Sequence, residues 1–303
     1  MTAQSWQVAH LADIRRRLAW LSAQPEGVLL DVASPLHHIR VVKQSGQVLF
    51  YFVDAATGAL DGPMSRMALD RPLELLAEYT QAAMAALVWR PEPRRVCLLG
   101  LAGGRLALAF YHYFPALAID NVDVDPAVAA IATDYFGLTF DRRQTLAIQD
   151  ARAFLRAQPA DRTYDIVVMD AFSAGAEDLP HLATAEFYAE CRARLARGGV
   201  LCANILRSDS LFFEKVKTFL QSFRQVYVSE HKHGLVLLGS DWARLARADI
   251  ARRARELQRR HGFKFPFEER ASALRPAREV GLIGGAALHG VRVLRDPLGG
   301  ETR

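Results

Sequence analysis

Short apolar stretches separated by turn residues fill the first third of the chain. Stretches rich in β-branched and aromatic residues predict three strands, Val28–Val32, His38–Val42 and Val48–Val53. The segment Gln44–Gly46 has the composition of a hairpin turn between the second and third strands. Residues 27–68 are therefore expected to form a small antiparallel β-segment.

Helical spacing of apolar residues is found on both sides of this segment. An amphipathic helix is predicted over Gln4–Leu21, within an N-terminal piece of residues 1–26. A second helix is predicted over Pro72–Val88, where leucines and alanines recur at helical spacing. Prolines 91 and 93 then break the chain. The second helix leads into a predicted nucleotide-binding domain of residues 69–240.

From Arg95 onwards, strands and helices alternate. Val96–Leu101 is apolar without alternation, as expected for a strand buried on both faces. The further predicted strands are Ala118–Val124, Thr145–Gln149, Ile166–Asp170, Val200–Ile205, Val226–Ser229 and Leu235–Leu238. The helices predicted between them are Leu106–Tyr113, Pro126–Tyr135, Ala151–Ala157, Thr184–Leu195, ended by Gly198-Gly199, and Leu211–Phe223. This order predicts an α/β fold, Rossmann-like and of the class I methyltransferase type, with a mostly parallel sheet covered by helices on both faces.

The last part of the chain, residues 241–303, is predicted to be a basic helix and tail. Seven arginines between Arg244 and Arg260 account for much of the net charge of +5. Because no aromatic residues are interleaved with them, a nucleic-acid platform is not expected. A solvated helix or one at the edge of a dimer is the better interpretation.

The cysteine content and the hydropathy indicate the kind of environment in which the protein is expected to work. Cys97, Cys191 and Cys202 each lie in an apolar run, with a spacing that fits no metal site. Reduced core thiols and a cytoplasmic protein are expected. No apolar run approaches the roughly 18 residues of a membrane span, so no membrane association is expected.

A glycine-rich turn and three acidic residues mark the expected binding site. Gly100, Gly103 and Gly104 follow the first strand of the alternating region and permit a tight turn before a helix. Asp123, about 20 residues further on, is suited to accept hydrogen bonds from both hydroxyls of a ribose. The neighbouring Asp125 is better explained as the N-cap of the next helix.

Two more aspartates follow the third and fourth strands of this region. Asp150 is suited either to bind the exocyclic amine of adenine or to cap the helix that starts at Ala151, and the residues alone do not decide between these roles. Asp170 ends an apolar strand at the same edge, where a carboxylate needs a cationic or hydrogen-bonding partner. The order of glycine turn and acids is typical of nucleoside-binding sheets.

The chain resembles the spermidine synthase (polyamine aminopropyltransferase) family over roughly residues 30 to 240. The stretches that carry the resemblance are VCLLGLAGGRLALAF, IDNVDVDPAVAAIATDYFG, IQDARAFL, YDIVVMDAF and LATAEFYAECRARLARGGVLCANI, together with SPLHHIRVV near the N-terminus. The resemblance implies decarboxylated S-adenosylmethionine as the donor co-substrate. Asp123 would then bind the ribose, Asp150 with Ala151 the adenine, and Asp170 would orient and help deprotonate the attacking amine. The family also implies a homodimer.

Three departures from the family pattern concern the half of the site that binds the amine. Gly103 stands where the family carries an acid that holds the aminopropyl amine of the donor, and Ser173 replaces a second acid. The segment from Val228 to Gly234 lacks the tyrosine of the family's acceptor site. Glu177, Asp178 and Glu230 are the nearby acids suited to replace those that are missing.

The residues expected near the acceptor combine these positions with polar residues of other segments. They are His37, Tyr79, Ser173, His231 and His233. His231 and His233 form an H-x-H pair, but no third ligand is visible, so no metal is expected.

Three functions follow from these observations. The first is transfer of an aminopropyl group from decarboxylated S-adenosylmethionine to a polyamine or another small amine. The alternative is an S-adenosylmethionine-dependent methyltransferase, favoured by Gly103, because its lack of an acid leaves room for the methionine carboxylate. The third is a non-catalytic nucleotide-binding protein.

Overall fold

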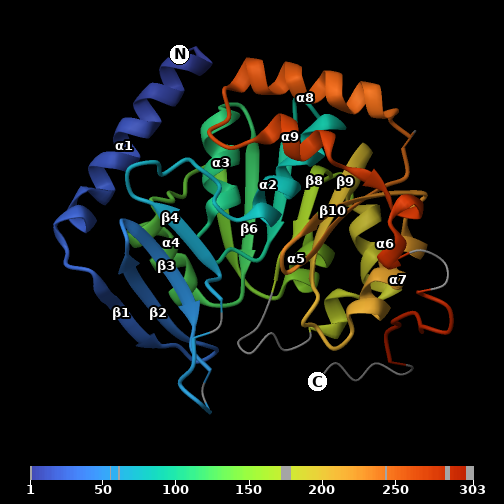
Figure 1. The fold of residues 1–303 in the computed structure, drawn as a ribbon, viewed down its shortest axis with the longest axis horizontal. Coiled ribbons are helices and arrows are strands. Elements are labelled where there is room, and N and C mark those ends of the chain that lie inside the picture. Colours follow the sequence, from blue (N-terminus) through green and yellow to red (C-terminus); the bar gives the residue numbers. More distant parts are fainter. Residues whose placement is uncertain are drawn as a thin grey trace.

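The computed structural model describes residues 2–54, 56–60, 62–171, 179–242, 244–283 and 287–297. These residues form two sheets, an antiparallel one of order β1-β2-β3-β4 and a larger one of order β12-β10-β11-β9-β8-β5-β6-β7. Figure 1 shows the small sheet and helix α1 on one side of the large sheet. The described residues contain no helix that is both long and apolar enough to cross a membrane.

The N-terminal part contains the three strands expected from the sequence and one that was missed. Its elements are α1 (Ala3–Ala23), β1 (Gly27–Ala33), β2 (His38–Gln44), β3 (Gln47–Phe52) and β4 (Ser65–Ala68). The predicted hairpin turn joins β2 to β3, with both Ser45 (φ 51°) and Gly46 (φ 70°) in the left-handed region. This backbone matches the twist of the strands that it joins.

The large sheet confirms the predicted α/β fold. Its strands are β5 (Arg95–Leu99), β6 (Ala118–Asp123), β7 (Gln144–Ile148), β8 (Tyr164–Met169), β9 (Leu195–Leu206), β10 (Gln225–His231), β11 (Gly234–Ser240) and β12 (Arg275–Pro276). Strands β7, β6, β5, β8 and β9 are parallel to one another, whereas β11, β10 and β12 continue the sheet antiparallel. The carboxyl ends of the parallel strands therefore meet at one edge.

Helices cover both faces of this sheet, and a hydrophobic cluster lies on each. They are α2 (Glu78–Met84), α3 (Arg105–Tyr113), α4 (Pro126–Phe136), α5 (Ala151–Ala157), α6 (Ala185–Ala193), α7 (Phe212–Ser222), α8 (Arg247–His261) and α9 (Phe267–Ser272). Short 3₁₀ turns lie at Ala85–Val88, Pro180–Leu182, Ala277–Glu279 and Gly281–Ile283. The cysteines 97, 191 and 202 are buried free thiols, as expected.

Two predicted element ends were wrong. The helix expected from Pro72 begins only at Glu78, because the carbonyl of Pro72 accepts a hydrogen bond from Arg105 and the carbonyl of Leu75 one from Gln81. Gly198-Gly199 does not end a helix, since it lies inside β9, which starts at Leu195. A Cβ atom on Gly199 would come within 3.0 Å of backbone oxygens, so a close approach of two strands explains this glycine.

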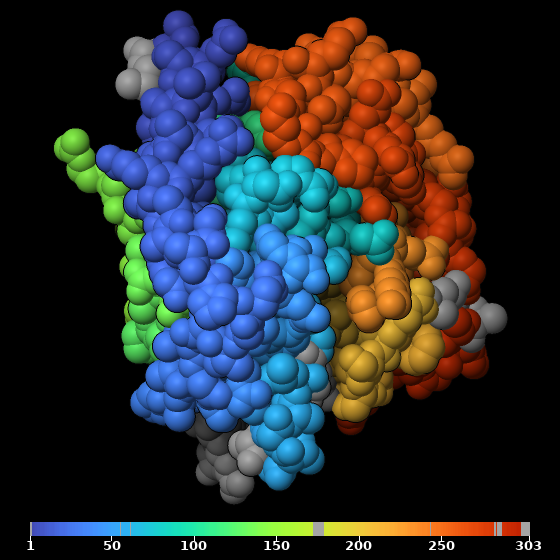
Figure 2. Space-filling view, turned by 60° about the vertical axis from the view of Figure 1, so that its left-hand side comes forward, coloured from blue at the N-terminus to red at the C-terminus, as the bar shows by residue number. Residues whose placement is uncertain are grey.

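The C-terminal part is packed more extensively than the sequence predicted. Helix α8 buries Ile250, Ala254 and Leu257, and α9, which was not predicted, packs against α2. Figure 2 shows α8 and α9 in orange against the cyan segment that contains α2. The basic helix α8 therefore has one face in the core and only the other in solvent. Further on, Asp296 is held by the guanidinium group of Arg152.

Candidate active site

The four segments selected from the sequence meet at the carboxyl edge of the parallel strands. The glycine turn follows β5, and Asp123, Asp150 and Asp170 follow β6, β7 and β8. The turn is joined to β6 directly, because the backbone N–H of Leu101 donates to Asp123 Oδ2 at 2.9 Å. This edge is where ligands bind in open α/β sheets.

The three glycines of the turn are required by packing within the chain. A Cβ atom on Gly100 would lie 2.4 Å from the backbone oxygen of Asp170, and one on Gly103 would lie 2.7 Å from Cβ of Ser65. Gly104 has φ 61° and faces Leu138. The space beside each of the three glycines is filled by other residues of the protein. Their part in nucleotide binding stays a prediction.

Asp123 is held at the edge of the site with hydrogen-bonding capacity to spare. Each carboxylate oxygen accepts one backbone N–H, from Leu101 at 2.9 Å and from Asp125 at 3.0 Å. Burial raises the pKa of this carboxyl above its usual range. Because a carboxylate oxygen has two lone pairs, both oxygens of Asp123 can accept one further hydrogen bond.

Asp125 and His37 form a buried pair beside this acid. Asp125 caps α4 through the N–H of Ala127, as expected, and its other oxygen lies 2.9 Å from Nδ1 of His37. The His37 ring stacks on Phe52 and is only 8% exposed. His37 thus lies close to Asp123, and its place near the acceptor stays a prediction.

Asp150 caps helix α5, which is one of the two roles that the sequence left open. Its Oδ1 caps α5 through the N–H of Ala153 at 2.8 Å, and its Oδ2 lies 3.0 Å from Nε2 of His181. The contact with His181 lowers the pKa of Asp150. Nearly half of the carboxylate surface is exposed, so the cap does not exclude a contact with a nucleotide.

Asp170 is half-buried and has two polar neighbours. Asn204, near the end of β9, donates from Nδ2 to Asp170 Oδ1 at 2.9 Å. The Tyr79 hydroxyl, which donates to the carbonyl oxygen of Met64 at 3.3 Å, lies beside the same carboxylate. Burial raises the pKa of Asp170 to about 7, although both hydrogen bonds oppose the rise. A carboxyl with this pKa takes up or releases a proton near neutral pH.

A histidine completes a hydrogen-bonded chain behind this carboxylate. Nε2 of His231 lies 3.1 Å from Oδ1 of Asn204, an acceptor, so this nitrogen carries the ring proton. Nδ1 accepts from the backbone N–H of His233 at 3.3 Å. Burial lowers the pKa of His231 to about 4, so the ring is neutral at neutral pH. With both nitrogens occupied, His231 orients Asn204 and does not act as a base in this arrangement.

The remaining expected acceptor residues separate into distinct groups. His233 is exposed in the tight β10–β11 turn, and Glu230 is exposed and paired with Arg207 and Arg275. Ser173, Glu177 and Asp178 lie outside the described residues. Among the described residues, no group of three or more histidine, cysteine and acidic side chains is placed to hold a metal ion.

Asn204 was missed in the sequence analysis, although a signal for it exists. It is the polar residue that interrupts the apolar run of β9, next to β8 in the sheet, and it therefore lies beside Asp170. Together with Ser65, Tyr79, Gly100 and Asp170, the buried Arg105 lines a cavity of about 20 Å³ at the base of the site. A cavity of this volume has room for one water molecule.

Comparison with known proteins agrees with this geometry. The chain is 32% identical over 151 residues to a polyamine aminopropyltransferase of Vibrio vulnificus, a match that covers 49% of the chain and 50% of that enzyme. It is 27% identical over 211 residues to the polyamine aminopropyltransferase of Chromobacterium violaceum, covering 66% of the chain and 78% of that enzyme. The chain is therefore similar to polyamine aminopropyltransferases over half to two thirds of its length. The first match spans only half of the relative's length, and no family model matches the chain.

Solved structures show the same fold. A probable spermidine synthase from Corynebacterium glutamicum superposes with a TM-score of 0.67 and 20% identity, covering 92% of this chain and 99% of that one. Human methyltransferase-like protein 13 in complex with SAH gives a TM-score of 0.57 and 23% identity, covering 61% of this chain and 93% of that one. The fold is thus common to aminopropyltransferases and methyltransferases.

Proposed function

We propose that this protein is a transferase that moves an aminopropyl group from decarboxylated S-adenosylmethionine to a small amine. The observation that carries the proposal is Asp170, a half-buried carboxyl that accepts a hydrogen bond from Asn204 at the carboxyl edge of the parallel strands and has a pKa of about 7. The relatives named as polyamine aminopropyltransferases support the same reaction. A polyamine is the acceptor class that these names suggest.

In the proposed reaction, the lone pair of the amine attacks the carbon next to the sulfonium. The carbon–sulfur bond breaks, its electron pair stays on sulfur, and methylthioadenosine leaves. The new ammonium group loses one proton to Asp170, which is suited to accept it because its pKa lies near neutral pH. The protein contributes mainly orientation, by holding the reacting atoms about 3–3.5 Å apart.

The nucleotide would lie against the acids that follow β6 and β7. Asp123 keeps a free lone pair on each oxygen, so it is suited to accept both ribose hydroxyls. Asp150 and Ala151 would face the adenine, with His181 holding the carboxylate in position. The backbone N–H of Gly103 already donates to Ser65 and is therefore not available to the nucleotide. The turn would contribute mainly the path of its backbone. The co-substrate supplies the sulfonium leaving group, and no metal is required.

The acceptor would enter beside Asp170, Tyr79 and the neutral ring of His231. Asn204 fixes the carboxylate, and His231 fixes Asn204. An ammonium group at this position would also lower the pKa of Asp170, because an opposite charge favours the ionised form. We propose in addition that the protein acts as a homodimer in the cytoplasm.

Methyl transfer from S-adenosylmethionine is the second candidate, favoured by two observations. An acid at position 103 would collide with Ser65, so the residue that holds the donor amine in the family has no room here. Arg105, whose side chain is buried, has no ion pair among the described residues. A buried cation favours a negatively charged donor group, such as the methionine carboxylate, over an ammonium group.

The experiment compares the two donors directly. The purified full-length protein is incubated with either donor and a panel of amines, and methylthioadenosine and S-adenosylhomocysteine are measured. We expect methylthioadenosine, a loss of roughly 10²–10⁴-fold in Asp170→Asn, and no change in the exposed control Asp134→Asn. S-adenosylhomocysteine as the product would replace the proposal by the second candidate. Nucleotide binding without any product would leave a non-catalytic binding protein.

A further inference from the structure

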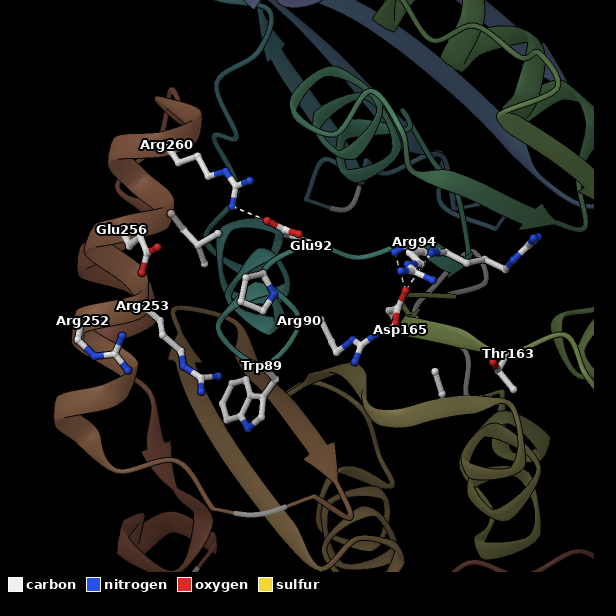
Figure 3. Close-up of a pocket in the computed structure, with 14 residues that line it drawn as sticks. Trp89, Arg90, Glu92, Arg94, Thr163, Asp165, Arg252, Arg253, Glu256 and Arg260 are labelled. Carbon is white, nitrogen blue, oxygen red and sulfur yellow. Dashed lines mark hydrogen bonds and ion pairs between the residues drawn. The ribbon is translucent and has the colours of Figure 1, made fainter. Parts of the chain in front are cut away.

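A large hollow lies on the opposite edge of the sheet from Asp170. It has a volume of about 860 Å³ and lies between α8 and the amino ends of β5, β8 and β9 (Figure 3). A strand of five residues spans roughly 16 Å, so the hollow is separated from the candidate active site by the length of a strand. The volume is within the range of small-molecule sites, about 300–1,000 Å³.

Arginines line this hollow from two sides. Arg252, Arg253 and Arg260 project from α8, and Arg90, Arg94 and Arg95 come from the segment that leads into β5. Figure 3 shows Arg252, Arg253 and Arg260 on one side of the hollow and Arg90 and Arg94 on the other, with the Trp89 indole ring between them. We call the six arginines the arginine clamp. The acids in the lining are Glu92, Asp165 and Glu256, and two arginines of the clamp, Arg95 and Arg252, pair with Asp120 and Asp249 outside it.

The acids neutralise only part of the clamp. Asp165 is occupied by Arg90 and by the backbone N–H groups of residues 94 and 95, and Glu92 pairs with Arg260 at 2.6 Å. Among the described residues, the side chain of Arg94 has no ion pair, and Arg253 contacts only the carbonyl oxygen of Val88. These two guanidinium groups, one on each side, are therefore the ones with donors available to a ligand.

The charge and the geometry define the ligand. Guanidinium groups bind phosphate through paired hydrogen bonds, and groups converging from two sides match an anion with several oxygens. The two unpaired arginines favour an anion over a polyamine or another cation. A long nucleic acid fits less well, because the lining contains a single aromatic ring, Trp89, which already packs edge-on against Tyr227. Binding of single strands usually requires a series of stacking rings.

We propose that the arginine clamp binds a small anion that carries two or more phosphate groups. The proposal is independent of the reaction at Asp170, since the two sites occupy opposite edges of the sheet. It gives a function to the arginine-rich helix α8, which the transfer reaction does not use.

The test is calorimetric titration of the full-length protein at physiological ionic strength, where weak surface attraction is screened. The probes are tripolyphosphate, ATP without metal, orthophosphate, and a short and a long single-stranded RNA. The double variant Arg94→Gln/Arg253→Gln removes the two available donors. The control, Arg255→Gln/Arg259→Gln, removes the same charge from exposed positions of α8 outside the hollow. The single variant Arg94→Gln leaves α8 intact, in case the double variant is poorly folded.

We expect tripolyphosphate and ATP to bind one to one and orthophosphate to bind more weakly. Arg94→Gln should weaken binding roughly tenfold, the double variant more, and the control within twofold. Equal affinities for tripolyphosphate and ATP would assign recognition to the phosphates alone, and tighter ATP binding would add the nucleoside. The proposal is overturned if neither probe binds, if the control loses as much affinity as the double variant, or if only RNA binds, with an affinity that rises with its length.

Discussion

Replacing Asp170 by Asn should stabilise the protein in the absence of ligands while it abolishes transfer. The carboxyl is half-buried, and its pKa is about 7 in the folded chain, against an ordinary value of 3.8. Above pH 7 the folded protein must therefore hold a partly desolvated negative charge that has no cationic partner among the described residues. An asparagine at this position keeps an oxygen that can accept the hydrogen bond from Asn204 and removes the charge.

The size of the effect follows from the shift in pKa. A folded-state pKa raised by about 3 units makes the protein about 4 kcal/mol less stable at alkaline pH than at acid pH, since each unit is worth about 1.4 kcal/mol. Because the folded carboxyl binds its proton more tightly than the unfolded one, this stability is fully present below pH 4 and is lost as the pH rises through 7. Between pH 5 and pH 8 the loss in the free energy of unfolding is about 3 kcal/mol.

The assay is urea denaturation of the wild type and Asp170→Asn at pH 5, 6, 7 and 8. The difference in unfolding free energy between the two proteins should grow in favour of the variant from pH 5 to pH 8. Asp134→Asn, at an exposed position, serves as the control for a change of one charge. Parallel pH profiles for the wild type and Asp170→Asn would refute the reasoning, because they would mean that this carboxyl titrates normally.

Three further predictions concern the neighbours of the site and the C-terminal segment. Asn204→Ala removes a hydrogen bond that lowers the pKa of Asp170, so the rising limb of kcat/KM against pH should move upwards by about one unit; an unchanged limb would contradict this. Gly103→Asp should lower the free energy of unfolding by about 1–3 kcal/mol through its collision with Ser65, and the added Ser65→Gly should restore part of it in urea denaturation. Arg152→Met leaves two carboxylates without their shared partner and should cost about 2 kcal/mol, with faster proteolysis near the C-terminus than in the wild type; because these carboxylates are partly exposed, the cost is below that of a fully buried pair.

The elements that the sequence predicted well are those whose signal is local. The apolar run of β5 and the turn at Ser45-Gly46 depend on residues that are adjacent in the chain. The four-residue strand β4 was missed because its pairing with β3, and not its composition, makes it a strand. The start of α2 was misjudged because Arg105, far along the chain, binds the Pro72 carbonyl.

The same distinction applies to the site. The positions of Asp123, Asp150 and Asp170 at one edge followed from strand order, since parallel strands end together. Their hydrogen-bonding partners did not follow, because Asn204 and His181 reach the acids only through the folding of other segments.

The contact between Ser65 and Gly103 restricts the order in which mutations can accumulate. With Ser65 present, an acidic side chain at position 103 meets β4 at once, so that step is disfavoured as long as the serine remains. A lineage that regained the acid would have to change residue 65 first, through an intermediate in which the N–H of Gly103 loses the Ser65 hydroxyl as its acceptor. The small N-terminal sheet thus limits which side chains single mutations can introduce at the glycine turn.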